Sequence, residues 1–144
     1  MTMKLKHTLL TITALNAFSL LSGADQPSTP SIIPVVRKPL LTAQIEGGKT
    51  VDRAEIKEIE MLNPMKGGLH LHPCPVVGYI VEGQILFQIE GQPEKNLKAG
   101  DAFFEPANVR ISHFDNMGPG KAKFVACYLL SSDDHALIKM LPEK

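Results

Sequence analysis

Short apolar runs alternate with turn-forming residues along most of this chain. No stretch between residues 40 and 130 shows the 3.6-residue apolar period of an amphipathic helix. Short strand-like runs recur instead at intervals of about ten residues, separated by Gly, Pro and Asn. We therefore predict strands over residues 54–62, 76–81, 84–90, 102–105, 109–114 and 122–130. This pattern indicates an all-β barrel or sandwich.

Some local features of the pattern are more specific. Two of the apolar runs meet at Glu82-Gly83, and we interpret them as a β-hairpin, because glycine can adopt the positive φ that such a turn requires. Residues 122–130, AKFVACYLL, are almost continuously apolar, as expected of a strand buried on both faces. In the polar C-terminal tail, residues 136–141 are expected to form a helical turn.

The first 24 residues have the pattern of a secretory signal peptide. Lys4 and Lys6 precede 16 uncharged residues, and Ser22 and Ala24 are small residues that suit cleavage after Ala24. The alternative is a retained membrane anchor, but the uncharged run is shorter than the ~20 residues that span a bilayer. We predict a secreted or periplasmic protein with no membrane segment after cleavage.

The remaining chain is predicted to hold one domain. Residues 25–39 contain four prolines and are expected to form an extended tether, followed by a single domain over residues 40–144. The formal net charge of the whole chain is zero and there is no basic stripe, which argues against nucleic-acid binding. An oxidising compartment would permit a disulfide between Cys74 and Cys127, but the sequence does not give their separation.

Two histidines carry the clearest chemical signal. His70 and His72 are one residue apart, and in an extended chain their side chains point to the same face. Two imidazoles on one face can bind a metal ion. They can equally be polar residues at the end of a strand, so the pair alone does not decide between these interpretations.

The residues around this pair resemble the first motif of the cupin superfamily. That motif is a glycine, five residues, His-x-His, three or four residues, a glutamate, six residues and a glycine. His70, His72 and Gly83 have this spacing, whereas Val76 stands at the glutamate position and Pro64 at the first glycine. The resemblance implies a small double-stranded β-helix, the jelly-roll barrel of cupins, which often forms homodimers.

A second stretch resembles the second cupin motif, which is a glycine, five residues, Pro-x-Gly, two residues, a histidine, three residues and an asparagine. Gly100 and Pro106 fit this motif. Asn108 replaces the glycine, Ile111 stands where the histidine is expected, and Asp115 stands for the asparagine. In the family three histidines and a glutamate hold the metal inside the barrel, so only His70 and His72 carry over.

Two further residues are candidates to complete a metal site. His113 lies two residues after Ile111, so a regular strand would point both the same way, and a bulge could move His113 into place. The alternative is a histidine at the strand end, facing water or a carboxylate. Cys74 lies two residues after His72, and its thiolate would give a His-His-Cys set suited to zinc or copper. Cys74 could instead be a packed thiol or half of a disulfide.

These observations predict a small exported cupin with a pocket inside the barrel. His70 and His72 are the predicted metal ligands, with His113 and Cys74 as weaker candidates, and Val76, Tyr79 and Ile111 are predicted to line the pocket. The expected cofactor is a divalent transition metal (Zn, Fe, Mn, Ni or Cu), and the expected partner is a small organic molecule. For an enzyme, the resemblance implies oxygen-dependent cleavage or isomerisation. The alternative is a metal-free module that binds a small ligand without chemistry.

Overall fold

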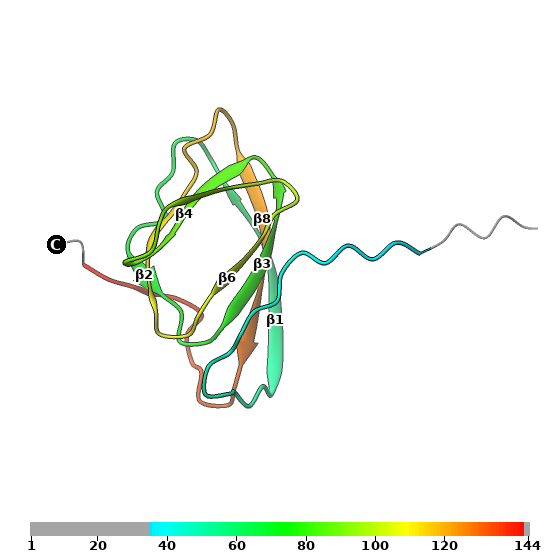
Figure 1. The fold of residues 1–144 in the computed structure, drawn as a ribbon. Coiled ribbons are helices and arrows are strands. Elements are labelled where there is room, and N and C mark those ends of the chain that lie inside the picture. Colours follow the sequence, from blue (N-terminus) through cyan, green and yellow to red (C-terminus); the bar gives the residue numbers. More distant parts are fainter. Residues whose placement is uncertain (1–34, 143–144) are drawn as a thin grey trace, which may run out of the picture. The chain divides into compact units, whose positions relative to one another are not determined.

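Two antiparallel sheets make up the fold in the computed structural model, which describes residues 35–142. The first sheet has the order β1-β8-β3-β6, formed by β1 (Arg53–Met61), β8 (Ala122–Leu130), β3 (Val76–Glu82) and β6 (Ala102–Glu105). The second has the order β5-β4-β7-β2-β9, formed by β5 (Lys95–Lys98), β4 (Gln84–Ile89), β7 (Arg110–Asp115), β2 (His70–Leu71) and β9 (Lys139–Met140). The two sheets face each other (Figure 1). The all-β barrel expected from the sequence is therefore confirmed.

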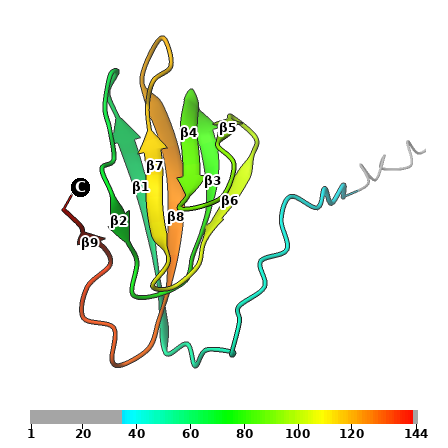
Figure 2. The same cartoon turned by 60° about the vertical axis from the view of Figure 1, so that its left-hand side comes forward.

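The predicted hairpin at Gly83 is wrong. β3 and β4 follow each other directly, but β3 pairs with β8 and β6 while β4 pairs with β5 and β7. The chain thus turns a corner from one sheet to the other (Figure 2). Gly83 has φ +75°, and a Cβ there would lie 2.5 Å from the Lys121 carbonyl oxygen, so only glycine fits the corner.

The C-terminal tail also differs from expectation. Residues 136–141 contain no helical turn, and β9 lies within them as a short strand paired with β2. The three shortest or most polar strands, β2, β5 and β9, were not predicted. Strands of two to four residues contain too few positions to show an alternating pattern.

Alternating side chains of the long strands fill the space between the sheets. In β8 every second residue from Ala122 to Leu130 is buried, and the intervening ones are half-buried. Phe103 and Phe124 from the first sheet meet Phe114 from the second, with ring centroids 5.0 and 4.8 Å from Phe114. This aromatic cluster occupies the interior next to the polar groups described below.

Some predictions concern residues outside the described range. The signal peptide, residues 1–24, and residues 25–34 of the tether are among them, so these remain predictions. Within residues 35–142 no helix has the length and apolar character needed to cross a membrane.

Candidate metal centre

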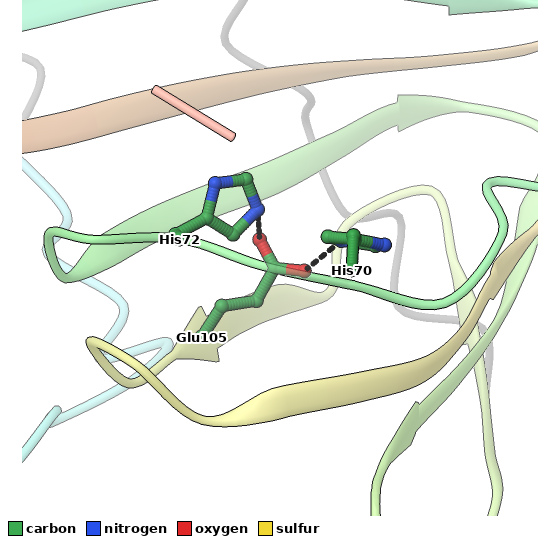
Figure 3. A group of neighbouring side chains, drawn as sticks. All are labelled: His70, His72 and Glu105. Carbon is green, nitrogen blue, oxygen red and sulfur yellow. Dashed lines mark ion pairs between the residues drawn. The ribbon is translucent and has the colours of Figure 1, made fainter. Parts of the chain in front are cut away.

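Three buried polar side chains converge between the two sheets. The Nε2 atom of His72 lies 3.2 Å from Glu105 Oε2, and Nε2 of His70 lies 3.6 Å from Glu105 Oε1. One ligand atom from each residue lies within 4.8 Å of the others, and each residue is only about 4% exposed. Figure 3 shows both imidazoles directed toward the carboxylate. The geometry is that of a small coordination sphere with three protein ligands.

The sheets fix the positions of these side chains. His70 lies in β2 and pairs with Ile111 of β7, while His72 follows one residue after the strand ends. Glu105 is the last residue of β6, just before Pro106. Asn108, which stands at the motif's glycine, has φ +59°, a conformation that asparagine tolerates better than most residues. The backbone amide of Asn108 donates a hydrogen bond to the His72 carbonyl at 2.7 Å, so asparagine in place of the motif's glycine preserves the turn.

Backbone carbonyls determine which nitrogen of each imidazole faces the site. Nδ1 of His70 donates to the Gly68 carbonyl at 2.7 Å, and Nδ1 of His72 donates to the Leu137 carbonyl at 2.5 Å. A carbonyl oxygen only accepts, so each neutral ring carries its proton on Nδ1 and presents an unprotonated Nε2 to Glu105. Metal-binding histidines are commonly oriented by such a hydrogen bond from the second ring nitrogen.

The pKa values of His70 and Glu105 depend on the interactions between these buried side chains. Burial opposes the charged form of His70, but the adjacent Glu105 carboxylate and the hydrogen bond to the Gly68 carbonyl outweigh it and raise the pKa of His70. Burial likewise opposes ionisation of Glu105, and the two histidines outweigh it and lower the pKa of this carboxyl. Glu105 is therefore a carboxylate, yet its Oε1 atom is buried without a hydrogen-bond partner. Such an atom is costly unless a cation or proton satisfies it.

Glu105 was not among the predicted ligands, although its position follows from the sheet register. Val76, which stands at the motif's glutamate position, pairs with Glu105 across β3 and β6. Directly opposite residues of antiparallel strands point to the same face with Cβ atoms about 4.5–5.5 Å apart. The carboxylate thus comes from the neighbouring strand. The sequence does show an acidic residue just before the motif proline. The direction of its side chain could not be known without the register of β3 and β6.

His113 lies outside the group of potential ligands identified in residues 35–142. Gln88 pairs with His113 and Ile89 with Ile111, so Ser112 is an extra residue in β7. This bulge breaks the alternation, so the side chain of His113 no longer points to the same face as that of the fully buried Ile111. His113 is 36% exposed, and its Nδ1 donates to Asp115 at 2.7 Å. The bulge therefore does not bring His113 to the other histidines.

Cys74 is also absent from this group of side chains. It is fully buried in the hydrophobic core. Burial, with the nearby negative charge of Asp134, raises the pKa of its thiol, which disfavours the thiolate that a metal requires. Cys74 and Cys127 are both free thiols.

A cavity of about 230 Å³ adjoins the three polar residues. Its walls come mainly from β1, β7 and β8, and include Phe114, Phe124 and Tyr128. None of the residues predicted to line the pocket borders this cavity. Val76 and Ile111 are fully buried core residues, and Tyr79 is 39% exposed beside Leu40 and Leu41 at another surface depression.

The segment after β8 closes one side of the cavity. Leu137 supplies the carbonyl that orients His72, and Ile138 contributes to the cavity wall. The segment begins with a turn in which Asp134 accepts hydrogen bonds from the Ser131 amide at 2.7 Å and from Lys49 Nζ at 2.7 Å. This turn anchors the segment to the domain.

Replacing Asp134 tests this anchor through pH. The Lys49 hydrogen bond, followed by that of the Ser131 amide, lowers the pKa of Asp134 from 3.8 to about 2. Because the folded pKa lies below the unfolded value, the stabilisation is complete above about pH 4 and is lost as the pH falls toward 2. Asp134→Asn is expected to lower the free energy of unfolding by about 1–2 kcal/mol at pH 6 and by little at pH 2. Urea unfolding of both proteins at the two pH values measures this, and an equal difference at both would contradict it.

Comparison with known proteins places the chain among cupin folds. Residues 59–128 match the family model described as Cupin domain. No curated protein sequence matches the chain.

Solved structures share the fold at low sequence identity. An oxalate oxidase in complex with the substrate analogue glycolate is 19% identical with a TM-score of 0.53, over 61% of this chain and 46% of that one. The DMSP lyase DddQ from Ruegeria pomeroyi DSS-3 is 20% identical with a TM-score of 0.51, over 62% of this chain and 43% of that one. An oxalate decarboxylase is 19% identical with a TM-score of 0.53, over 61% and 24%. This chain therefore spans less than half the length of these neighbours.

Proposed function

Because this chain belongs to the cupin superfamily, we propose that it is a small metal-dependent cupin. His70, His72 and Glu105 hold a divalent transition metal, and a small organic molecule binds in the adjoining cavity. The oxalate and DMSP named for the structural neighbours are not assigned to this chain, since likeness at this identity concerns the fold.

The arrangement of acceptor atoms is the observation that carries the proposal. The Nε2 atoms of both histidines face a buried carboxylate, and one carboxylate oxygen has no hydrogen-bond partner. When both rings are neutral, with their protons on Nδ1, these atoms are three electron-pair donors that repel one another unless a cation lies among them. Two histidines and one carboxylate suit zinc as well as non-haem iron.

The protein residues have distinct roles in this scheme. The carbonyls of Gly68 and Leu137 hold the imidazoles in the ligating tautomer, and Glu105 offsets one positive charge. The apolar walls provide contacts for an apolar part of the bound molecule. A divalent metal would supply Lewis acidity toward a bound oxygen atom, and a three-ligand site leaves positions open for it.

Counting the metal in the natural protein tests the proposal. The protein is purified without chelators or affinity metal, and Zn, Fe, Mn, Ni and Cu are measured per chain by mass spectrometry. We expect one metal ion per chain, or stoichiometric uptake of Co²⁺ after dialysis with the spectrum of a nitrogen- and oxygen-ligated ion. A folded protein that contains no metal and takes up none would contradict the proposal.

That contrary result would favour a metal-free ligand-binding module. The ion pairs of Glu105 with His70 and His72, and the raised pKa of His70, support this second candidate, since a protonated imidazole can neutralise the carboxylate directly. The cavity would then bind a small molecule without chemistry.

We also propose that the protein is exported and forms a homodimer. The signal-peptide pattern of residues 1–24 supports export, and the family resemblance supports pairing. On the preparation used for metal counting, the intact mass is expected to correspond to a chain beginning at Asp25 and light scattering to two chains. A retained N-terminus or a monomer would contradict the respective part.

A further inference from the structure

The cavity beside the metal centre is polar at one end only. His70, His72 and Glu105 border it, together with the Tyr128 side chain and Gly67. The other bordering residues are apolar side chains of β1, β7 and β8 and of the C-terminal segment: Ile59, Met61, Phe114, Phe124, Ala126 and Ile138. No lysine or arginine borders the cavity in the described part of the chain.

The charge available to a bound molecule is correspondingly small. A divalent metal next to the Glu105 carboxylate leaves about one net positive charge, which matches a neutral or singly charged oxygen group. A second carboxylate held too far from the first to chelate the same metal would lie against Phe114 or Phe124 without a cationic partner. An unpaired charge beside these buried rings is unfavourable, so these walls disfavour such a molecule.

The volume limits the size of the molecule. The cavity measures about 230 Å³. Cavities that enclose drug-sized ligands are larger, at about 300–1,000 Å³.

We propose that the substrate is a small molecule with one oxygen-bearing polar end and an otherwise apolar body, and that dicarboxylates whose second carboxylate cannot reach the metal are disfavoured. The polar end binds at His70, His72 and Glu105, and the apolar end packs against Phe114 and Phe124. This inference rests on the proposed function, because it places the polar end at the metal.

A pair of isosteric acids tests the inference. The two probes, 5-methylhexanoate and glutarate, carry the same 3-carboxypropyl group, and the isopropyl group of the first has the shape of the second carboxylate of glutarate. The three methylene groups of glutarate disfavour chelation of one metal ion by both carboxylates. With metal-loaded protein, calorimetric titration is expected to give at least tenfold tighter binding of 5-methylhexanoate. Equal or tighter binding of glutarate, with the metal still present by mass spectrometry, would overturn the substrate class and leave the metal centre in place.

A variant in the cavity wall tests whether the lack of a positive charge there causes the preference. Ile138 is 46% exposed, so a long side chain can replace it without filling the core. Ile138→Lys supplies a cation to the wall and is expected to reduce or invert the preference, whereas Ile138→Gln, a neutral residue of similar length, is expected to bind 5-methylhexanoate more tightly than glutarate. A preference that Ile138→Lys leaves unchanged would contradict the charge argument.

A neutral pair separates this inference from the metal proposal. If the protein takes up no metal, the proposed function fails, and 3-methylbutanamide is compared with malonamide, which has the same shape with a second amide in place of the isopropyl group. Tighter binding of 3-methylbutanamide to metal-free protein would still support a cavity that is polar at one end only. Tighter binding of malonamide would overturn it.

Discussion

Exchanging the residues at positions 76 and 105 is expected to rebuild a metal site that the loss of Glu105 destroys. Glu105→Val removes the only charged ligand and is expected to weaken metal binding roughly 100-fold or more. Loss of a group that only orients a metal ligand typically weakens binding 10–100-fold, and loss of the ligand itself should have a larger effect. Val76→Glu added to Glu105→Val is expected to recover affinity to within about tenfold. The two residues oppose each other across β3 and β6, so the carboxylate returns one strand away on the same face.

Competition with a chromophoric chelator measures these affinities for the natural protein, both single variants and the exchange. Glu105→Gln serves as a control that keeps the shape of the side chain and removes its charge, and it is expected to resemble Glu105→Val. Circular dichroism of each variant shows whether it folds. A folded exchange variant that binds metal as weakly as Glu105→Val would contradict the cross-strand explanation.

The same pair shows what the sequence can and cannot predict about this site. His70 and His72 were accessible because their spacing falls on a motif and alternation along a strand is a local property. Glu105 was not accessible, because whether it shares a face with Val76, 29 residues away in the chain, depends on how β3 and β6 align. A one-residue change of register would have turned the carboxylate away.

Local irregularities explain the other differences. A single extra residue at Ser112 reverses the expected facing of His113 relative to Ile111. Its trace in the sequence is a shift in the apolar pattern, in which Ile111 is followed by an apolar residue at 114 instead of 113. The corner at Gly83 carries the same signal as a hairpin, since both need a glycine with positive φ between two apolar runs. The long strands were predictable because one irregularity disturbs only part of a pattern that extends over six or more residues.

The contribution of the C-terminal segment to the site was the hardest to predict from the sequence. A carbonyl oxygen has no residue-type signal, yet that of Leu137 determines the tautomer of His72. The segment reaches the site because β9 pairs with β2 and the Leu141 amide donates to the Leu69 carbonyl at 2.8 Å. The metal centre therefore depends on backbone atoms supplied from 65 residues away in the chain.

Ending the chain at Asp134 is expected to weaken metal binding about 10–100-fold, the range observed when a group that orients a metal ligand is lost. The change removes the Leu137 carbonyl and the Ile138 wall but retains the Asp134 turn. The fold is expected to persist, because β9 contributes only two exposed residues to the edge of its sheet. A chain ending at Pro142 keeps β9 and is expected to bind metal normally.

The tautomer of His72 distinguishes orientation from general loosening of the site. In the natural protein without metal, ¹⁵N chemical shifts of the neutral imidazole are expected to show the proton on Nδ1, held by the Leu137 carbonyl. In the chain ending at Asp134 the same ring is expected to show both tautomers, because the acceptor is gone while Glu105 still faces Nε2. Unchanged shifts together with natural metal affinity in the folded truncated chain would show that Leu137 does not position this ligand.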